Sequence, residues 1–194
     1  MGNFYTNYTV ATSDVASVAA ALQGRNALLT PALEGYVVVY DEASEHQDVD
    51  EIRVLTATLS AAVGAPVLGA LNHDDDVLLL FLADSGAVVD DYNSSPGYFE
   101  DEDARPPEGG DAARLCALFG AESVAEVESI LRRWDDFSDE PDVDPPDDVY
   151  IFEVERHSAL VGALGLPVAS VGFGYRYVSR GELPAGVASV LRVP

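Results

Sequence analysis

The stretch that decides the fold spans residues 67–92 and reads VLGALNHDDDVLLLFLADSGAVVDDY. Apolar runs at 67–71, 77–83 and 87–92 are separated by the polar turn at 72–76 and by the turn signal Asp-Ser-Gly. Short apolar runs between turn residues predict antiparallel strands joined as a meander. The middle run lacks apolar–polar alternation, so we expect it at the centre of a sheet with both faces covered.

Further strands are predicted on the N-terminal side of this stretch. Residues 3–11 alternate aromatic and polar side chains, which is typical of a strand. Residues 26–30 and 36–40 predict a hairpin around a turn that contains proline and glycine. Between these strands, Ser13 is placed to cap a short helix and Gly24 is placed to end it.

A second helix is predicted to begin at Asp48, with Glu51 three residues later as in a capping box, and to end at Gly64. Its apolar stripe consists of Ile52, Leu55, Leu59 and Val63. The elements then follow the order β-α-β-β-α-β-β-β. The first six match a ferredoxin-like order, which the meander extends. The predicted fold class is therefore α+β, with a mainly antiparallel sheet and helices packed on it.

The C-terminal half begins with a polar loop at 93–110, rich in proline and glycine. Two short helices are predicted next, at 111–119 and 123–133, and the second has a capping box. An acidic loop at 135–148 follows, with prolines and no basic residue, a composition that is usually solvated and that serves in some proteins as an interaction segment.

Two predicted elements complete the chain. Residues 150–164 fit both a strand and one face of a helix, and we favour a helix because Gly165 and Pro167 supply stop signals. Residues 168–178 alternate in the manner of a closing strand. Residues 1–194 are therefore expected to form a single α+β domain.

The charge of the chain is strongly negative. It contains 34 acidic residues against 10 basic ones, all of them arginine, for a formal net charge of −24. Such a charge repels phosphate, so we expect no direct binding to nucleic acid or to an anionic membrane. It attracts basic proteins and divalent cations. Solubility, or adaptation to a salty cytoplasm, explains the same excess.

The compartment follows from three absences in the sequence. Residues 1–9 lack the basic and then apolar pattern of a secretory signal. No apolar run approaches the ~18 residues that a membrane-spanning helix needs. Cys116 is the only cysteine, so no intrachain disulfide forms. We therefore expect a soluble, cytoplasmic protein.

One cluster has the composition of a metal site. His73, Asp74 and Asp76 lie in the turn between two predicted strands, and oxygen and imidazole ligands suit divalent cations. Asp91 is a candidate ligand from a second strand, and a bound metal could activate water for hydrolysis. The alternative is a polar hairpin turn in which Asn and Asp side chains cap their own backbone.

Two segments are predicted to bind a partner. The loop that follows residue 92 is rich in aromatic and polar residues, which make good contacts at little cost in entropy; the alternative is that its aromatic side chains fold back over the sheet edge. The acidic loop would supply carboxylates. The candidate contact residues are Tyr92, Asn93, Tyr98, Phe99, Asp142, Asp144, Asp147 and Asp148.

No catalytic motif accompanies these segments. The sequence has no Gly-x-Ser-x-Gly elbow, phosphate-binding loop, dinucleotide fingerprint or paired-cysteine metal site. We therefore predict no catalytic residue, and no cofactor other than a possible divalent cation.

Two sequence segments carry a resemblance. MGNFYTNYT at 1–9, and NHDDDV at 72–77 together with YNSSPGYF at 92–99, resemble segments of uncharacterised bacterial proteins. The resemblance implies a bacterial origin, and it brings no activity, ligand or catalytic residue with it.

Three functions are consistent with these observations. We favour a non-enzymatic acidic binding protein that engages a basic protein partner, in the manner of immunity proteins or nucleic-acid mimics, because steering by opposite charges accelerates association. The second hypothesis is a metal-assisted hydrolase that uses His73, Asp74 and Asp76. The third is an accessory domain whose acidity serves only solubility or salt adaptation.

Overall fold

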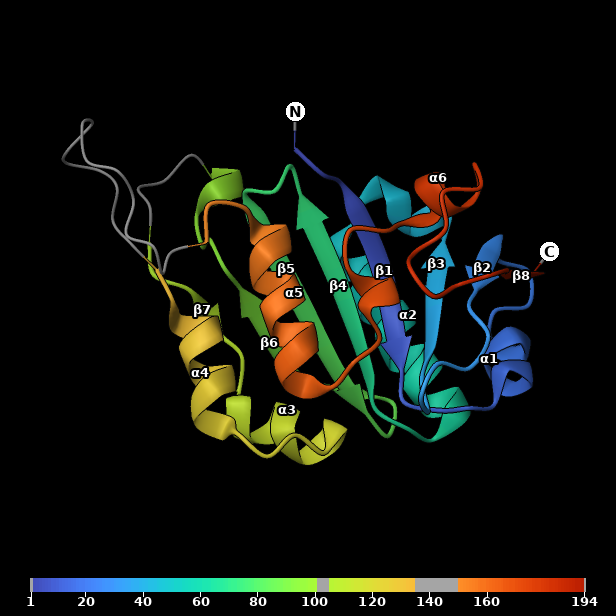
Figure 1. Ribbon diagram of the computed structural model, residues 1–194, viewed down its shortest axis with the longest axis horizontal. Coiled ribbons are helices and arrows are strands. Elements are labelled where there is room, and N and C mark those ends of the chain that lie inside the picture. The colour runs from blue at the N-terminus through green and yellow to red at the C-terminus, as the bar shows by residue number, and fades with distance from the viewer. Residues whose placement is uncertain (1, 101–104, 135–149, 194) are drawn as a thin grey trace.

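The computed structural model describes residues 2–100, 105–134 and 150–193. In this part of the chain, eight strands form one sheet in the order β7-β6-β5-β4-β1-β3-β2-β8, and every neighbouring pair is antiparallel (Figure 1). The strands are β1 Tyr5–Val10, β2 Ala27–Leu29, β3 Val37–Asp41, β4 Val67–His73, β5 Val77–Asp84, β6 Ala87–Asn93, β7 Glu108–Gly109 and β8 Leu191–Val193. The predicted α+β class with a mainly antiparallel sheet is confirmed.

Helices cover both faces of this sheet. The α-helices are α1 Val15–Ala21, α2 Val49–Val63, α3 Ala112–Phe119, α4 Val124–Arg132, α5 Glu153–Leu164 and α6 Tyr175–Val178. The 3-10 helices are η1 Ala43–His46, η2 Tyr98–Glu100 and η3 Val168–Ser170. In Figure 1, α1 and α2 lie behind the sheet, while α5 and α6 lie in front of it. The molecule is thus built in three layers.

The predicted ferredoxin-like order is present at the centre. The chain runs β1-α1-β2-β3-α2-β4, and these four strands lie side by side in the order β4-β1-β3-β2. The meander β5-β6-β7 extends the sheet beyond β4, and β8 extends it beyond β2. Both sites described below lie at the sheet end where β4 finishes.

Strand β5 is buried on both faces, as its uninterrupted apolar run predicts. Phe81 packs with Tyr8 and Ile52 on the side of α1 and α2. Leu80 and Leu82 pack with residues of α3, α4 and α5 on the opposite side. A strand covered on both faces has no solvent side, which is why it lacks alternation.

The helix ends follow ordinary capping chemistry. The Asp48 carboxylate accepts hydrogen bonds from the Asp50 and Glu51 amides at the start of α2, and Gly64 ends this helix in the left-handed region at φ 63°. The cap of α1 differs from the prediction by one residue. Helix α1 begins at Val15, so Asp14 and not Ser13 is the N-cap.

The predicted strand at 168–178 is wrong. This segment forms η3 and α6 and crosses the face of the sheet. Its carbonyl groups are satisfied by side chains from the strands below: Asn7 Nδ2 donates to the Ser170 and Phe173 oxygens at 2.6 and 2.8 Å, and the Tyr40 hydroxyl donates to the Ala169 oxygen at 2.7 Å. The edge of β2, where a closing strand would pair, is taken by β8.

The remaining predictions have mixed outcomes. Residues 153–164 are helical, which confirms the helix favoured for 150–164. The polar loop at 93–110 contains η2 and the short strand β7, which pairs with β6. Residues 101–104 of that loop and the acidic loop at 135–148, with its candidate contacts Asp142, Asp144, Asp147 and Asp148, lie outside the described residues. None of the described helices has the length and apolarity needed to cross a membrane.

Candidate partner-binding surface

The turn between β4 and β5 presents three consecutive carboxylates at one end of the sheet. Asp74 and Asp75 adopt positive φ angles of 54° and 63°, a conformation that Asp tolerates better than most residues. The N-terminal segment crosses this turn. The Gly2 amide donates to Asp74 Oδ1 at 2.8 Å, and the Asn3 amide donates to Asp75 Oδ2 at 2.9 Å.

A hollow of about 470 Å³ lies beside this turn. Helix α5 forms its other wall, because the Glu153 amide donates to the Asp75 carbonyl at 2.8 Å. Asp75 Oδ1 is buried and has no hydrogen-bond partner among the described residues. The lining residues are Gly2, Asp74, Asp75, Asp76, Phe152 and Val154. The hollow therefore combines three carboxylates with one aromatic ring, which suits a cationic group.

Next to the hollow, the His73 ring is enclosed by aromatic rings. The centroids of Phe4, Phe99 and Tyr98 lie 4.9, 5.1 and 6.1 Å from that of His73, all in edge-on arrangements. His73 Nδ1 lies 2.6 Å from Gln47 Oε1. Because Gln47 Nε2 donates to the Asn72 carbonyl at 2.8 Å, Oε1 is the acceptor and Nδ1 carries the proton. His73 is thus held as a packing residue and a hydrogen-bond donor.

The aromatic residues at this end are unusually open to solvent. Phe99 is 57% exposed, Phe152 is 51% exposed and Tyr98 is 38% exposed. The Tyr98 hydroxyl donates to Asp76 Oδ2 at 3.0 Å, and this hydrogen bond to a carboxylate raises the pKa of Tyr98. The term acidic–aromatic surface denotes Phe4, His73, Asp74, Asp75, Asp76, Tyr98, Phe99 and Phe152.

The structure divides the predicted contact residues. Tyr98 and Phe99 lie on the acidic–aromatic surface. Tyr92 is only 3% exposed, and its hydroxyl donates to the Leu131 carbonyl at 2.9 Å, so it belongs to the core. Asn93 is half-buried and accepts a hydrogen bond from the Ser95 amide. The sequence did not single out Phe152, because only the fold brings it to the Asp turn.

The predicted metal ligands do not converge. His73 contacts Gln47, Asp74 accepts from the Gly2 amide, and Asp76 accepts from Tyr98. Asp91 forms an ion pair with Arg53 on a different part of the sheet. Residues 2–100, 105–134 and 150–193 contain no group of three His, Cys, Asp or Glu side chains that could hold a metal ion. The metal-assisted hydrolase stays a prediction without support from this geometry.

A buried polar layer supports the surface from below. The Tyr5 hydroxyl and His157 Nδ1 lie 2.7 Å apart, and burial lowers the pKa of His157 to about 4. The imidazole is therefore neutral at pH 7. The Arg156 guanidinium pairs with Glu153 at 2.8 Å and donates to the Ile130 carbonyl at 2.7 Å. Burial raises the pKa of Glu153.

The sequence contains one signal for the ion pair: Glu153 and Arg156 are three residues apart, which places them on the same face of a helix. The imidazole, hydroxyl and carboxylate groups of the layer bond to one another or to backbone, which fits a structural role. The chemistry that the surface offers to a ligand is instead exposed carboxylates beside exposed aromatic rings.

Comparisons of the chain with protein-family models, with curated proteins and with solved structures find no match.

Proposed function

We propose that this chain is a non-enzymatic binding protein that captures a basic segment of a partner protein at the acidic–aromatic surface. One observation carries the proposal: half-exposed Phe152 lines a hollow together with three Asp carboxylates, and half-exposed Phe99 packs on the adjoining His73. An arginine or lysine side chain fits this combination, because the ammonium or guanidinium group meets carboxylates while its stem or face meets an aromatic ring.

The expected energies favour a cation with apolar neighbours. A cation over an aromatic ring gains about 0.5–2 kcal/mol, depending on how far it is desolvated. A hydrogen bond to a charged group contributes about 1.5–3 kcal/mol. Asp76, which is exposed on the lining of the hollow, supplies a carboxylate acceptor for such a cation.

The net charge of the whole chain should also accelerate association with a basic partner. A net charge of −24 attracts a basic partner over long distances and raises the association rate, especially at low salt. Long-range attraction alone does not choose a site. The aromatic anchors supply the local contact that distinguishes this surface from other acidic parts of the molecule. Such a protein would act in the manner of immunity proteins or nucleic-acid mimics.

The test is a titration of isotope-labelled protein with a hexa-arginine peptide, followed by amide chemical shifts at about 150 mM salt, where charges are screened beyond about 8 Å. We expect saturable changes at residues 2–4, 73–76, 98–100 and 152–154. Asp76→Asn should weaken binding about three- to tenfold, since one unit of charge and one acceptor are lost from the site. Phe99→Ala should weaken it without any change of charge.

The matched control is Glu122→Gln, which removes one negative charge from an exposed position between α3 and α4. If Glu122→Gln weakens the peptide as much as Asp76→Asn does, binding is general attraction to an acidic surface and the proposal is wrong. Shift changes that spread evenly over the molecule would lead to the same conclusion.

A further inference from the structure

A second hollow, of about 680 Å³, lies where the turn after α1, the segment from β3 to η1, and α6 meet. Arg25, Arg176 and Arg180 line it. Arg192 adds a fourth guanidinium, since its Nη1 lies 3.2 Å from both Asn26 Oδ1 and the Tyr175 hydroxyl of the lining. Four of the chain's 10 basic residues thus lie together in a molecule of net charge −24. This hollow is called the arginine groove.

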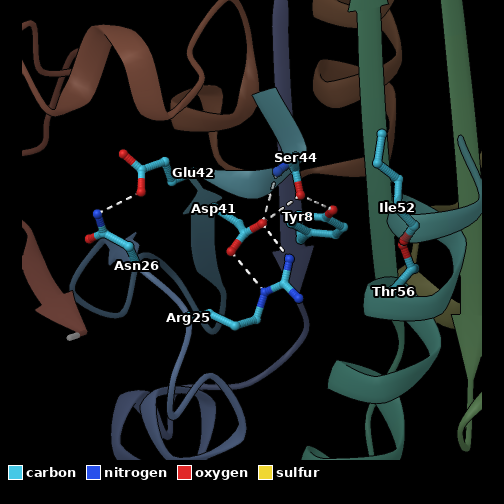
Figure 2. A network of polar contacts seen from close by, with 8 residues as sticks. All are labelled: Tyr8, Arg25, Asn26, Asp41, Glu42, Ser44, Ile52 and Thr56. Carbon is cyan, nitrogen blue, oxygen red and sulfur yellow. Dashed lines mark hydrogen bonds and ion pairs between the residues drawn. The ribbon is translucent and has the colours of Figure 1, made fainter. Parts of the chain in front are cut away.

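Arg25 is fixed by a buried network, which Figure 2 shows. Its Nε and Nη2 donate to the two carboxylate oxygens of Asp41 at 2.8 and 2.7 Å. Asp41 is 1% exposed and also accepts from the Ser44 amide and hydroxyl at 3.0 and 2.8 Å. The Ser44 hydroxyl lies 2.6 Å from that of Tyr8. The guanidinium is therefore held in one orientation, and its Nη1 makes no hydrogen bond within the described part of the chain.

Arg176 and Arg180 come from the α6 side. Arg176 Nε lies 3.5 Å from Glu45 Oε2, and its backbone amide donates to Glu45 Oε1 at 3.2 Å. The exposed Arg180 guanidinium has no hydrogen bond or ion pair with any residue in the ranges 2–100, 105–134 and 150–193. Asp41 thus balances Arg25, and Glu45 interacts with both Arg176 and Arg180, so these two carboxylates do not balance all four arginines.

One further carboxylate, Glu42, lies on the rim. It accepts a hydrogen bond from Asn26 Nδ2 at 2.8 Å, which occupies it in part. Glu42 disfavours a highly charged polymer and leaves room for one small anionic group. The volume agrees, since pockets for small molecules measure about 300–1,000 Å³. A nucleic-acid strand would also meet repulsion from the rest of the acidic chain.

We propose that the arginine groove binds the anionic group, a carboxylate or a phosphate, of a small molecule. Arg180 supplies a guanidinium that makes no hydrogen bond in the described structure, and Arg25 and Arg176 supply N–H donors beside it. Guanidinium groups match the planar carboxylate and the phosphate oxygens with two parallel hydrogen bonds. The site is separate from the acidic–aromatic surface, takes the opposite charge, and does not depend on the function proposed there.

The test uses two probes, inorganic phosphate and acetate, each titrated into isotope-labelled protein at constant ionic strength set with sodium chloride. We expect saturable amide shift changes at residues 24–26, 41–46 and 175–180. Tighter binding of phosphate would assign a phosphate-bearing ligand, and tighter binding of acetate a carboxylate-bearing one. Arg180→Gln should weaken the tighter probe by at least about tenfold. It should leave the melting temperature nearly unchanged, since the exposed Arg180 side chain makes no hydrogen bond in the described structure.

The matched control is Arg114→Gln, which removes one positive charge from the exposed surface of α3. It should change the affinity by less than about twofold, because a distant exposed charge is screened. The proposal is overturned if neither probe gives saturable, localised shifts, or if Arg114→Gln weakens binding as much as Arg180→Gln does. Asp76→Asn, on the acidic–aromatic surface, should leave binding at the arginine groove intact.

Discussion

Asp41 shows how one buried carboxylate organises its surroundings. It is 1% exposed and receives four hydrogen bonds, two from Arg25 and two from Ser44. Asp41→Ala should lower the free energy of unfolding by about 2–4 kcal/mol, because buried donors lose their acceptor. The loss should lie toward the lower end of this range, because the Arg25 side chain is 34% exposed and water can replace its lost acceptor. Urea unfolding measures the change.

The neighbouring residue provides the comparison for this prediction. Glu42→Ala removes an exposed carboxylate that holds only Asn26, so the expected change is within about 0.5 kcal/mol. Equal effects of Asp41→Ala and Glu42→Ala would show that the network does not stabilise the fold.

His157 makes stability depend on pH. Burial holds its pKa at about 4 in the folded protein, below the ordinary 6.5 that applies when the chain is unfolded. Between these values the unfolded chain binds the additional proton. Stability is therefore complete above about pH 6.5 and falls as the pH drops toward 4, by up to about 1.4 kcal/mol per pH unit. Urea unfolding at a series of pH values measures the slope.

A variant isolates the histidine contribution from that of carboxylates. Burial raises the pKa of Glu45 and Glu153, so protonation of these two carboxyl groups stabilises the folded protein as the pH falls. Their effect is opposite to that of His157. His157→Asn keeps a hydrogen-bonding group for the Tyr5 hydroxyl and cannot titrate. Its stability should be less dependent on pH between 6.5 and 4 than that of the parent; parallel curves would contradict the prediction.

The N-cap position of helix α5 holds a residue type that is not among those preferred there. Phe152 is the N-cap, makes no side-chain hydrogen bond there, and is half exposed. Phe152→Ser should add a cap worth about 0.5–2 kcal/mol while losing about half the burial of an aromatic side chain, roughly 1 kcal/mol. We therefore expect a melting temperature close to that of the parent and clearly weaker binding of the hexa-arginine peptide.

Phe152→Ala separates the two contributions of this position. It loses the same burial and gains no cap, so it should be less stable than Phe152→Ser by about 1 kcal/mol and should bind the peptide equally weakly. A serine variant that binds as tightly as the parent would remove Phe152 from the proposed contact surface.

The segment at 168–178 shows where element prediction from sequence fails. Its alternating Val, Phe and Tyr residues match a strand, but strand formation needs a free sheet edge, and β8 takes the edge of β2. Asn7 and Tyr40 side chains satisfy the carbonyl groups instead. Periodicity is a local signal, so it reports neither the occupied edge of β2 nor the side chains that bond to these carbonyl groups. The helices and hairpins with their own caps and turn residues, such as α2 with Asp48 and Gly64, were predictable because their signals are local.

Asn7 tests this explanation. Asn7→Ala removes the donor to both the Ser170 and Phe173 carbonyls and leaves them buried without that partner. We expect a loss of about 2 kcal/mol in stability and faster amide hydrogen exchange confined to residues 168–178. Unchanged exchange in this segment would show that other contacts hold it in place.

For the whole molecule, charge should act on folding and binding in opposite directions. Repulsion within a chain of net charge −24 disfavours the compact state, and salt screens it, so the melting temperature should rise between about 10 mM and 1 M salt, as the Debye length falls from about 30 to 3 Å. Over the same range the hexa-arginine peptide should bind more weakly. A peptide affinity independent of salt would contradict the role assigned to the carboxylates.

The two sites differ in how much of them the sequence contains. His73, Asp74 and Asp76 lie in one turn, and Tyr98 and Phe99 lie in one loop, so five of the eight residues of the acidic–aromatic surface were visible as two local clusters. Phe152 joins only through the fold. The arginine groove was invisible, because Arg25 and Arg180 lie far apart in the sequence. Contacts between distant residues follow from strand order, which no local pattern specifies.

The pairing of β2 with β8 also constrains the order in which the protein can assemble. Ala27, Leu28 and Leu29 pair with Val193, Arg192 and Leu191, so this pair of strands joins residues that lie far apart in the sequence. Until β8 arrives, the outer backbone groups of β2 are unpaired, which leaves this edge open to wrong partners. Contacts between distant residues form slowly, so pairing of β8 should be a late step of folding.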